Sequence, residues 1–170
     1  TDQPLAPEGE ALARERRERM PEVDGIWVSP LKRCRQTAEL LFPGMEQRIV
    51  PDLQECDFGD YECKTWEELK DEEIYRAWIG GDMTITFPHG ESMEHFIARC
   101  RSGIQTVAQE AKALGLERPA IVAHGGTWLV VMGTFGRPER KLYDWQVKNC
   151  GGFRVSAQEN PFTLKLLEEL

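Results

Sequence analysis

The clearest hydrophobic pattern along the chain is a short apolar run at residues 120–123, which Pro119 precedes and a glycine pair follows. Continuous apolar residues between such breakers are typical of a strand that is buried on both faces. The run ends at His124, and the apolar residues that continue to Met132 after the glycines predict a helix. In an open α/β sheet, a residue at the carboxyl end of a strand faces the ligand crevice. The pattern therefore predicts that His124 lies at such a crevice.

Shorter patterns predict the remaining elements. Ser29 followed by Pro30 is typical of a helix cap and a first helical residue, and Thr65 with Glu68 has the form of a capping box. We expect helices at residues 8–20, 30–42, 71–78, 91–114 and 139–145, a short helix after Thr65, and strands at 25–28, 48–50, 152–155 and 162–166. Strand–helix units that end in a hairpin predict a three-layer α/β/α domain with a mostly parallel central sheet and an antiparallel edge.

Composition narrows the class of protein. A chain of 170 residues with 41% hydrophobic and 29% charged residues is typical of one globular domain with a substantial core. Its formal net charge of −8 argues against general binding to nucleic acid or to a membrane surface. We find no apolar run near the roughly 20 residues of a membrane span and no secretory signal, so we expect a cytoplasmic protein. Five scattered cysteines and three histidines predict reduced thiols and no zinc site.

Two predicted strand-to-helix corners carry candidate chemistry. His124 and Gly125 form one corner, where a helix N-terminus suits an anion, and Ser29 lies at the other, one helical turn before Arg33. A guanidinium binds phosphate oxygens in pairs, so Arg33 and His124 would form an anion site if the two strands are neighbours. The alternatives are a core histidine and a solvated arginine. Glu55 lies in an acidic loop that is either solvated or holds a proton donor.

A set of motifs in a fixed order resembles a known family. The motifs lie at residues 29–38 (SPLKRCRQTA), 53–62 (LQECDFGDYE), 90–92 (GES) and 123–126 (AHGG). Together they resemble the histidine phosphatase (phosphoglycerate mutase-like) superfamily, and the spacing of Leu53, Glu55, Asp57, Phe58 and Gly59 is most similar to bacterial α-ribazole phosphatases and their broad-specificity relatives. The resemblance implies the phosphoglycerate mutase-like fold.

The resemblance also implies roles for single residues. His124 would be the second active-site histidine, Arg33 an arginine of the phosphate pocket, and Glu55 the general acid that protonates the leaving oxygen. Ser29 and Gly125 are further candidates for substrate binding, and His89 would line the pocket mouth at a position where the family usually has glycine. The implied chemistry passes through a phosphohistidine and needs no metal and no cofactor.

The attacking histidine of the family lies in an Arg-His-Gly motif at the end of the first strand, upstream of the segment that resembles residues 2–9. This sequence starts at Thr1 and contains no such motif. We therefore expect residues 1–170 to form a single histidine phosphatase-like domain that is incomplete at its N-terminus. Without the first strand, two strand edges of the sheet would be unpaired.

The function that these features predict is hydrolysis of a small phosphorylated metabolite such as α-ribazole 5′-phosphate. One alternative is phosphoryl transfer of the phosphoglycerate mutase type. Another is a protein that binds phosphate esters without catalysis, if the attacking histidine is absent. The apolar late strands are a candidate edge for a homodimer.

Overall fold

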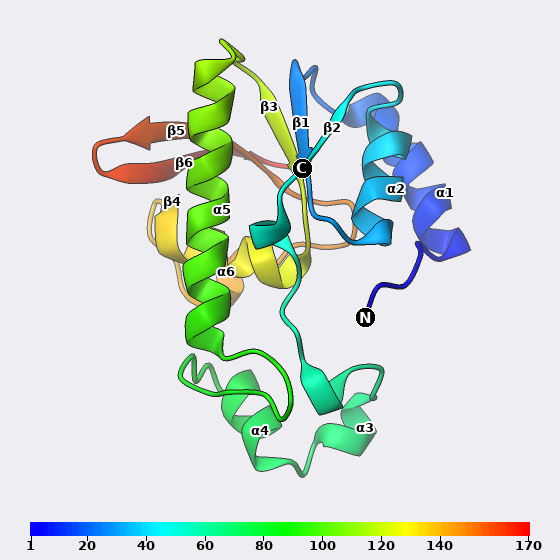
Figure 1. The fold of residues 1–170 in the computed structure, drawn as a ribbon, viewed down its shortest axis with the longest axis vertical. Coiled ribbons are helices and arrows are strands. Elements are labelled where there is room, and N and C mark those ends of the chain that lie inside the picture. The colour runs from blue at the N-terminus through cyan, green and yellow to red at the C-terminus, as the bar shows by residue number, and fades with distance from the viewer. The chain divides into compact units, whose positions relative to one another are not determined.

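The strand at the centre of the larger sheet, β1, is buried along its whole length and organises the elements around it (Figure 1). The computed structural model describes residues 1–170. Its elements are α1 (Pro7–Arg16), β1 (Gly25–Val28), α2 (Lys32–Leu41), β2 (Gln47–Ile49), α3 (Trp66–Leu69), α4 (Glu73–Ile79), α5 (Met93–Ala113), β3 (Pro119–Val122), α6 (Gly125–Phe135), β4 (Gly136–Arg137), β5 (Phe153–Glu159) and β6 (Phe162–Glu169). Short 3-10 helices lie at Arg17–Arg19, Pro51–Leu53, Gly59–Tyr61 and Leu142–Trp145. No helix has the length and apolar character that crossing a membrane requires.

The chain folds as two compact units. The smaller unit comprises Thr1 and Cys56–Arg99, and the larger unit comprises Asp2–Glu55 and Cys100–Leu170. Helix α5 therefore contributes its first turns to the smaller unit and the rest to the larger one.

The larger unit contains a parallel sheet of three strands in the order β2-β1-β3. Val28 of β1 is in register with Ile49 of β2 and with Val122 of β3, so all three strands end at one edge. This arrangement confirms the predicted parallel sheet, and β1 has the bounds that its sequence pattern predicts.

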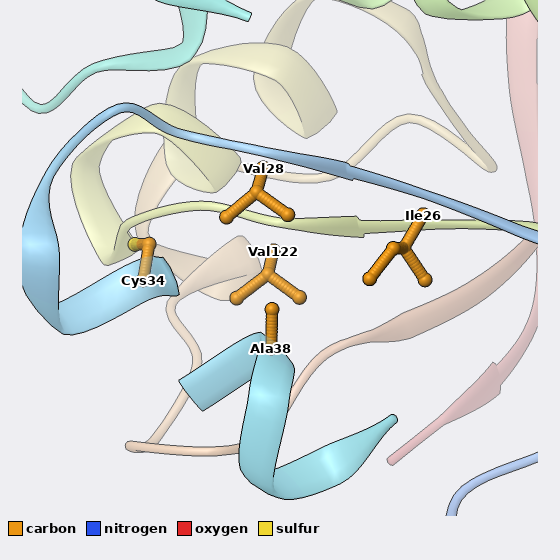
Figure 2. Packing of buried hydrophobic residues seen from close by; sticks show 5 residues of the cluster. All are labelled: Ile26, Val28, Cys34, Ala38 and Val122. Atoms are coloured by element: carbon orange, nitrogen blue, oxygen red, sulfur yellow. The ribbon is translucent and has the colours of Figure 1, made fainter. Parts of the chain in front are cut away.

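Side chains of β1 alternate between two apolar layers. Ile26 and Val28 point to α2, where Figure 2 shows them packed with Val122, Ala38 and Cys34. Trp27 points to the other face and packs in a second cluster with residues of α5 and of the segment after β2, namely Val50, Leu53, Val107 and Ala111. Because α2 covers one face and α5 the other, the larger unit has the predicted α/β/α layers.

A second, mixed sheet of the larger unit has the order β4-β6-β5. Strands β5 and β6 pair antiparallel and confirm the predicted hairpin, and both are longer than their sequence pattern indicates. Strand β4 pairs parallel with β6 and was not predicted, because two residues carry no periodicity. Strands β2 and β3 form the two edges of the parallel sheet, and β4 and β5 form those of the mixed sheet.

Two predicted features are wrong. Ser29 does not cap the following helix, which starts at Lys32 with Leu31 at the cap position; the Ser29 hydroxyl accepts from the Leu31 N–H at 3.4 Å and also bonds a distant side chain described below. The helix expected at residues 139–145 is only a 3-10 turn at Leu142–Trp145. The capping box of Thr65 and Glu68 is confirmed.

The smaller unit is built around an aromatic cluster and a backbone crossing. The rings of Phe58, Trp78 and Phe87 pack edge to face, with centroids 5.0–5.7 Å apart. Beside them the segment around Gly59 crosses the segment around Gly90, and the Asp60 N–H donates to the Pro88 carbonyl at 2.9 Å. A Cβ on Gly59 would collide with that carbonyl oxygen and lie 2.5 Å from the Gly90 nitrogen.

We predict that Gly59→Ala destabilises the protein by more than about 3 kcal/mol, since the positive φ of 53° and the collision with rigid backbone add up. Gly81→Ala is the matched control, because Gly81 also has a positive φ, 90°, but a Cβ there meets no atom within 4 Å. It should cost only about 1–2 kcal/mol. Urea unfolding followed by circular dichroism measures both, and equal losses would contradict the role of the backbone crossing.

Candidate active site

His124 lies at the carboxyl end of β3, where the strand passes into α6. It is the N-cap residue of α6 with extended backbone angles, φ −113° and ψ 163°, and its carbonyl accepts the first helical hydrogen bond from the Trp128 N–H at 2.9 Å. Only 6% of the residue is exposed. The structure therefore confirms the predicted strand-to-helix corner at His124.

The neighbouring strand brings Ser29 to the same point. The Ser29 N–H donates to the Val122 carbonyl at 2.9 Å, continuing the ladder between β1 and β3 past the last paired residues. The fully buried Ser29 hydroxyl lies 2.7 Å from Nε2 of His124. Ser29 and His124, far apart in sequence, thus form one buried hydrogen-bonded pair.

Cys34 of α2 completes the contacts of the imidazole. Its Sγ lies 3.4 Å from Nε2 and 3.6 Å from Nδ1 of His124, and it donates to the Ala123 carbonyl at 3.4 Å. Contacts from a strand end on one side and a helix on the other restrict rotation of the ring. Cys34 had no predicted role, although it follows Arg33 directly and lies on the buried face of α2.

The electrostatics of Cys34 link the remaining candidates to this cluster. Burial raises the pKa of the Cys34 thiol from 9.0 to about 12, against the opposing effects of the Arg33 charge and of a hydrogen bond with Ser29. The Glu55 carboxylate raises the pKa further. Because the charges of Arg33 and Glu55 both act on this thiol, the structure brings Ser29, Arg33, Glu55 and His124 into one neighbourhood.

Glu55 reaches the site through the first turn of α6. The N–H of Gly126, two residues after His124, donates to Glu55 Oε2 at 3.2 Å. A carboxylate in this position is favoured by the free N–H groups and the dipole of the helix N-terminus. Glu55 is therefore held at the first turn of the helix that His124 caps, and it is not a member of a merely solvated acidic loop.

The other two sequence candidates differ in their surroundings. Gly125 is the first residue of α6, and a Cβ there would meet no protein atom within 4 Å, so the position of its missing side chain is open. His89 belongs to the smaller unit, has a positive φ of 53° and an exposed ring, and bonds Asp60 at 2.9 Å through Nδ1. Substrate binding by Gly125 and His89 stays a prediction.

The side chains of the structure offer no evident metal centre. No group of three or more histidine, cysteine, aspartate or glutamate side chains is arranged to hold a metal ion, and all five cysteines are free thiols.

We predict that Cys34 resists alkylation in the native protein at pH 9, because a buried thiol with a pKa near 12 is almost wholly protonated there. The exposed Cys63 should react under the same conditions. Iodoacetamide labelling read by peptide mass spectrometry measures both, with denatured protein as the control in which Cys34 reacts. Rapid labelling of native Cys34 would contradict the environment described above.

The comparison with known proteins adds two curated relatives and one solved structure. The chain is 31% identical over 153 residues, 87% of this chain and 73% of the relative, to a Hydrogenobacter thermophilus protein that carries a provisional name as phosphoserine phosphatase 2. It is 29% identical over 149 residues, 85% of this chain and 72% of the relative, to the adenosylcobalamin/alpha-ribazole phosphatase of Salmonella typhimurium. The crystal structure of a phosphoglycerate mutase from Thermus thermophilus is similar with a TM-score of 0.73 at 30% identity, covering 100% of this chain and 85% of the other.

The family model of branch 1 of the histidine phosphatase superfamily matches the chain along its whole described length, residues 1–170. The relatives agree with this match in sequence, and the solved structure agrees in fold. The chain therefore belongs to the histidine phosphatase superfamily (branch 1).

Proposed function

We propose that this protein hydrolyses phosphomonoesters through a phosphohistidine intermediate, with a small phosphorylated metabolite as its substrate. Among such metabolites we favour α-ribazole 5′-phosphate. Two features support this choice: the Leu53 to Gly59 motif and the similarity to the Salmonella typhimurium α-ribazole phosphatase. Phosphoserine is the next substrate to test, because the Hydrogenobacter thermophilus relative carries that name.

One observation carries the proposal. A carboxylate, Glu55, and a buried imidazole, His124, meet at the N-terminus of one helix, and the charge of Arg33 acts in the same neighbourhood. An arginine and free helix N–H groups bind a phosphoryl group, and a carboxyl group beside them is suited to proton transfer. A purely structural core histidine would not need a carboxylate and a guanidinium close by.

The proposed chemistry has two steps. In the first, an imidazole nitrogen attacks phosphorus, the bond from phosphorus to the ester oxygen breaks, and that oxygen takes the proton of the Glu55 carboxyl group. In the second, water attacks the phosphohistidine, the Glu55 carboxylate takes a proton from the water, and the bond from nitrogen to phosphorus breaks to release phosphate. Arg33 and His124 stabilise the negative charge on the phosphoryl oxygens in both steps.

The attack itself is assigned to the histidine of an Arg-His-Gly motif, which residues 1–170 do not contain. Besides His124 the sequence has His89, which bonds Asp60, and His95, whose Nδ1 lies 2.5 Å from Glu91 on the first turns of α5. Neither follows a strand end. Activity should therefore be compared between residues 1–170 and a chain extended at its N-terminus by a segment with this motif, and activity confined to the extended chain would assign the attack to that segment.

Phosphoglycerate mutase activity is a second candidate, because the chain is 30% identical to a structure of that name. It predicts transfer of the phosphoryl group between the hydroxyls of a glycerate instead of loss to water. Release of free phosphate without formation of 2-phosphoglycerate from 3-phosphoglycerate would exclude it. A protein that only binds phosphate esters would show saturable binding and no release of phosphate.

We predict that Arg33→Ala and His124→Gln each lower kcat/KM for phosphate release by about 100- to 1,000-fold, since each removes a charge or donor from the phosphoryl group. Arg35→Ala is the matched control for Arg33→Ala, because Arg35 is an exposed arginine on the same helix. His95→Gln is the control for His124→Gln. Full activity in either active-site variant would contradict the proposal.

We also predict that prolonged incubation with a chelating agent leaves the phosphatase rate unchanged, because an imidazole attacks directly and Arg33 neutralises the phosphoryl charge. The measurement compares the rate of phosphate release by untreated protein with the rate after incubation with the chelator and its removal on a desalting column. A loss of activity that added magnesium or zinc restores would show that the chemistry depends on a metal.

A further inference from the structure

We propose that Gly126 is a positioning residue for Glu55: its missing side chain leaves the space in which the carboxylate lies, and its N–H orients that carboxylate. The inference rests on the proposed function, in which Glu55 protonates the leaving oxygen. It concerns the second glycine of the pair that follows His124, whereas the sequence motif makes only the first, Gly125, a candidate for substrate binding.

The space beside Gly126 is filled by the Glu55 side chain. A Cβ at residue 126 would collide with Glu55 Oε1 and would lie 3.1 Å from Cδ and 3.2 Å from Oε2. The carboxylate group thus occupies the place that any other residue would need for its own side chain. Gly125 differs, because a Cβ there meets nothing within 4 Å.

The same turn of α6 also fixes the backbone that carries Glu55. The Thr127 hydroxyl, on a residue that is only 1% exposed, lies 3.4 Å from the Leu53 carbonyl and 3.5 Å from the Gln54 carbonyl. Leu53 is itself 1% exposed within the cluster around Trp27. Side-chain contacts from Thr127 and the backbone N–H of Gly126 therefore hold consecutive residues of one segment against the helix.

This arrangement fixes the position of Glu55, the proposed acid, relative to the turn that contains His124. His124 is the N-cap of α6 and Gly126 is its second residue, so His124 and the donor to Glu55 belong to one rigid turn. A shift of about 1 Å in a catalytic group can lower a rate about 100-fold. The atoms that an alanine at residue 126 would strike are the far end of a flexible side chain, which can rotate away, so the substitution should displace the carboxylate and leave the fold intact.

The test uses the active enzyme and two substrates that differ in leaving group. An alkyl phosphate such as glycerol 2-phosphate leaves as a basic alkoxide and needs a proton from the acid, whereas p-nitrophenyl phosphate leaves as a stable phenolate and needs much less help. Gly126→Ala should lower kcat/KM for glycerol 2-phosphate by at least about tenfold, a part of the about 100-fold or more that general acid catalysis supplies. Its kcat/KM for p-nitrophenyl phosphate should change little, because kcat/KM reports the step that forms the phosphohistidine and not the later hydrolysis, in which Glu55 acts as a base on both substrates.

Three further variants test whether Gly126→Ala lowers the rate by displacing the Glu55 carboxylate. Glu55→Gln should show the same selectivity with a larger loss, about 100-fold on glycerol 2-phosphate, and adding Gly126→Ala to it should lower the rate no further. Thr127→Val, which replaces the hydroxyl with a methyl group of similar size, should show the selectivity too, and it is the variant to use if Gly126→Ala does not fold. Gly152→Ala is the matched control, because a Cβ there meets nothing within 4 Å, and it should leave both rates unchanged.

The outcomes separate this inference from the proposed function. If Glu55→Gln lowers kcat/KM for both substrates equally, or for neither, the acid role of Glu55 is wrong and the proposed mechanism fails. If Glu55→Gln is selective but folded Gly126→Ala and Thr127→Val behave like the parent enzyme, the mechanism stands and the positioning role of Gly126 is overturned. An additive loss in the double variant would likewise overturn it.

Discussion

The candidate site depends on the parallel pairing of β1 with β3. Val28 and Val122 are in register, and the Ser29 N–H bonds the Val122 carbonyl one step beyond the paired residues. Since parallel strands end at a common edge, the residues that follow both strands are forced together. A slip of one residue in this pairing would turn every side chain of β3 to the opposite face and separate Ser29 from His124.

The alternation of side chains along β1 decides what else reaches that edge. Ile26 and Val28 bind α2 to one face, and α2 carries Arg33 and Cys34 on its first turn. Trp27 points to the opposite face and packs in the cluster that contains Leu53, two residues before Glu55. Arg33 and Glu55 therefore come from elements on opposite sides of one sheet, and the charges of both act on the Cys34 thiol.

Those parts of the fold and of the candidate site that depend on neighbouring residues could be predicted from the sequence. The bounds of β1, the corner at His124 and the capping box at Thr65 follow from short runs of apolar, glycine and capping residues. What could not be predicted depends on contacts between distant segments. Ser29 has the sequence of a helix cap, but its hydroxyl bonds His124, a partner that no local rule contains.

The two glycines after His124 also differ in a way that the sequence does not predict. In the sequence they are equivalent, and either could be required by the turn. In the structure Gly125 faces open space, whereas the space beside Gly126 is filled by a carboxylate from a segment 71 residues away. The constraint on Gly126 thus comes from tertiary structure alone.

The contact between Cys34 and His124 raises a different chemistry, because a thiol beside an imidazole can form the thiolate–imidazolium pair of a cysteine nucleophile. The burial of Cys34 and the pKa of its thiol both argue against a cysteine nucleophile in this protein. The residue is 4% exposed, and burial outweighs Arg33 and Ser29 so that the pKa of the thiol rises to about 12. A thiol that stays protonated at neutral pH does not attack a substrate, and it does not transfer its proton to the His124 imidazole. Cys34 therefore contacts the imidazole as a neutral thiol, and its role beside His124 is to restrict the orientation of the ring.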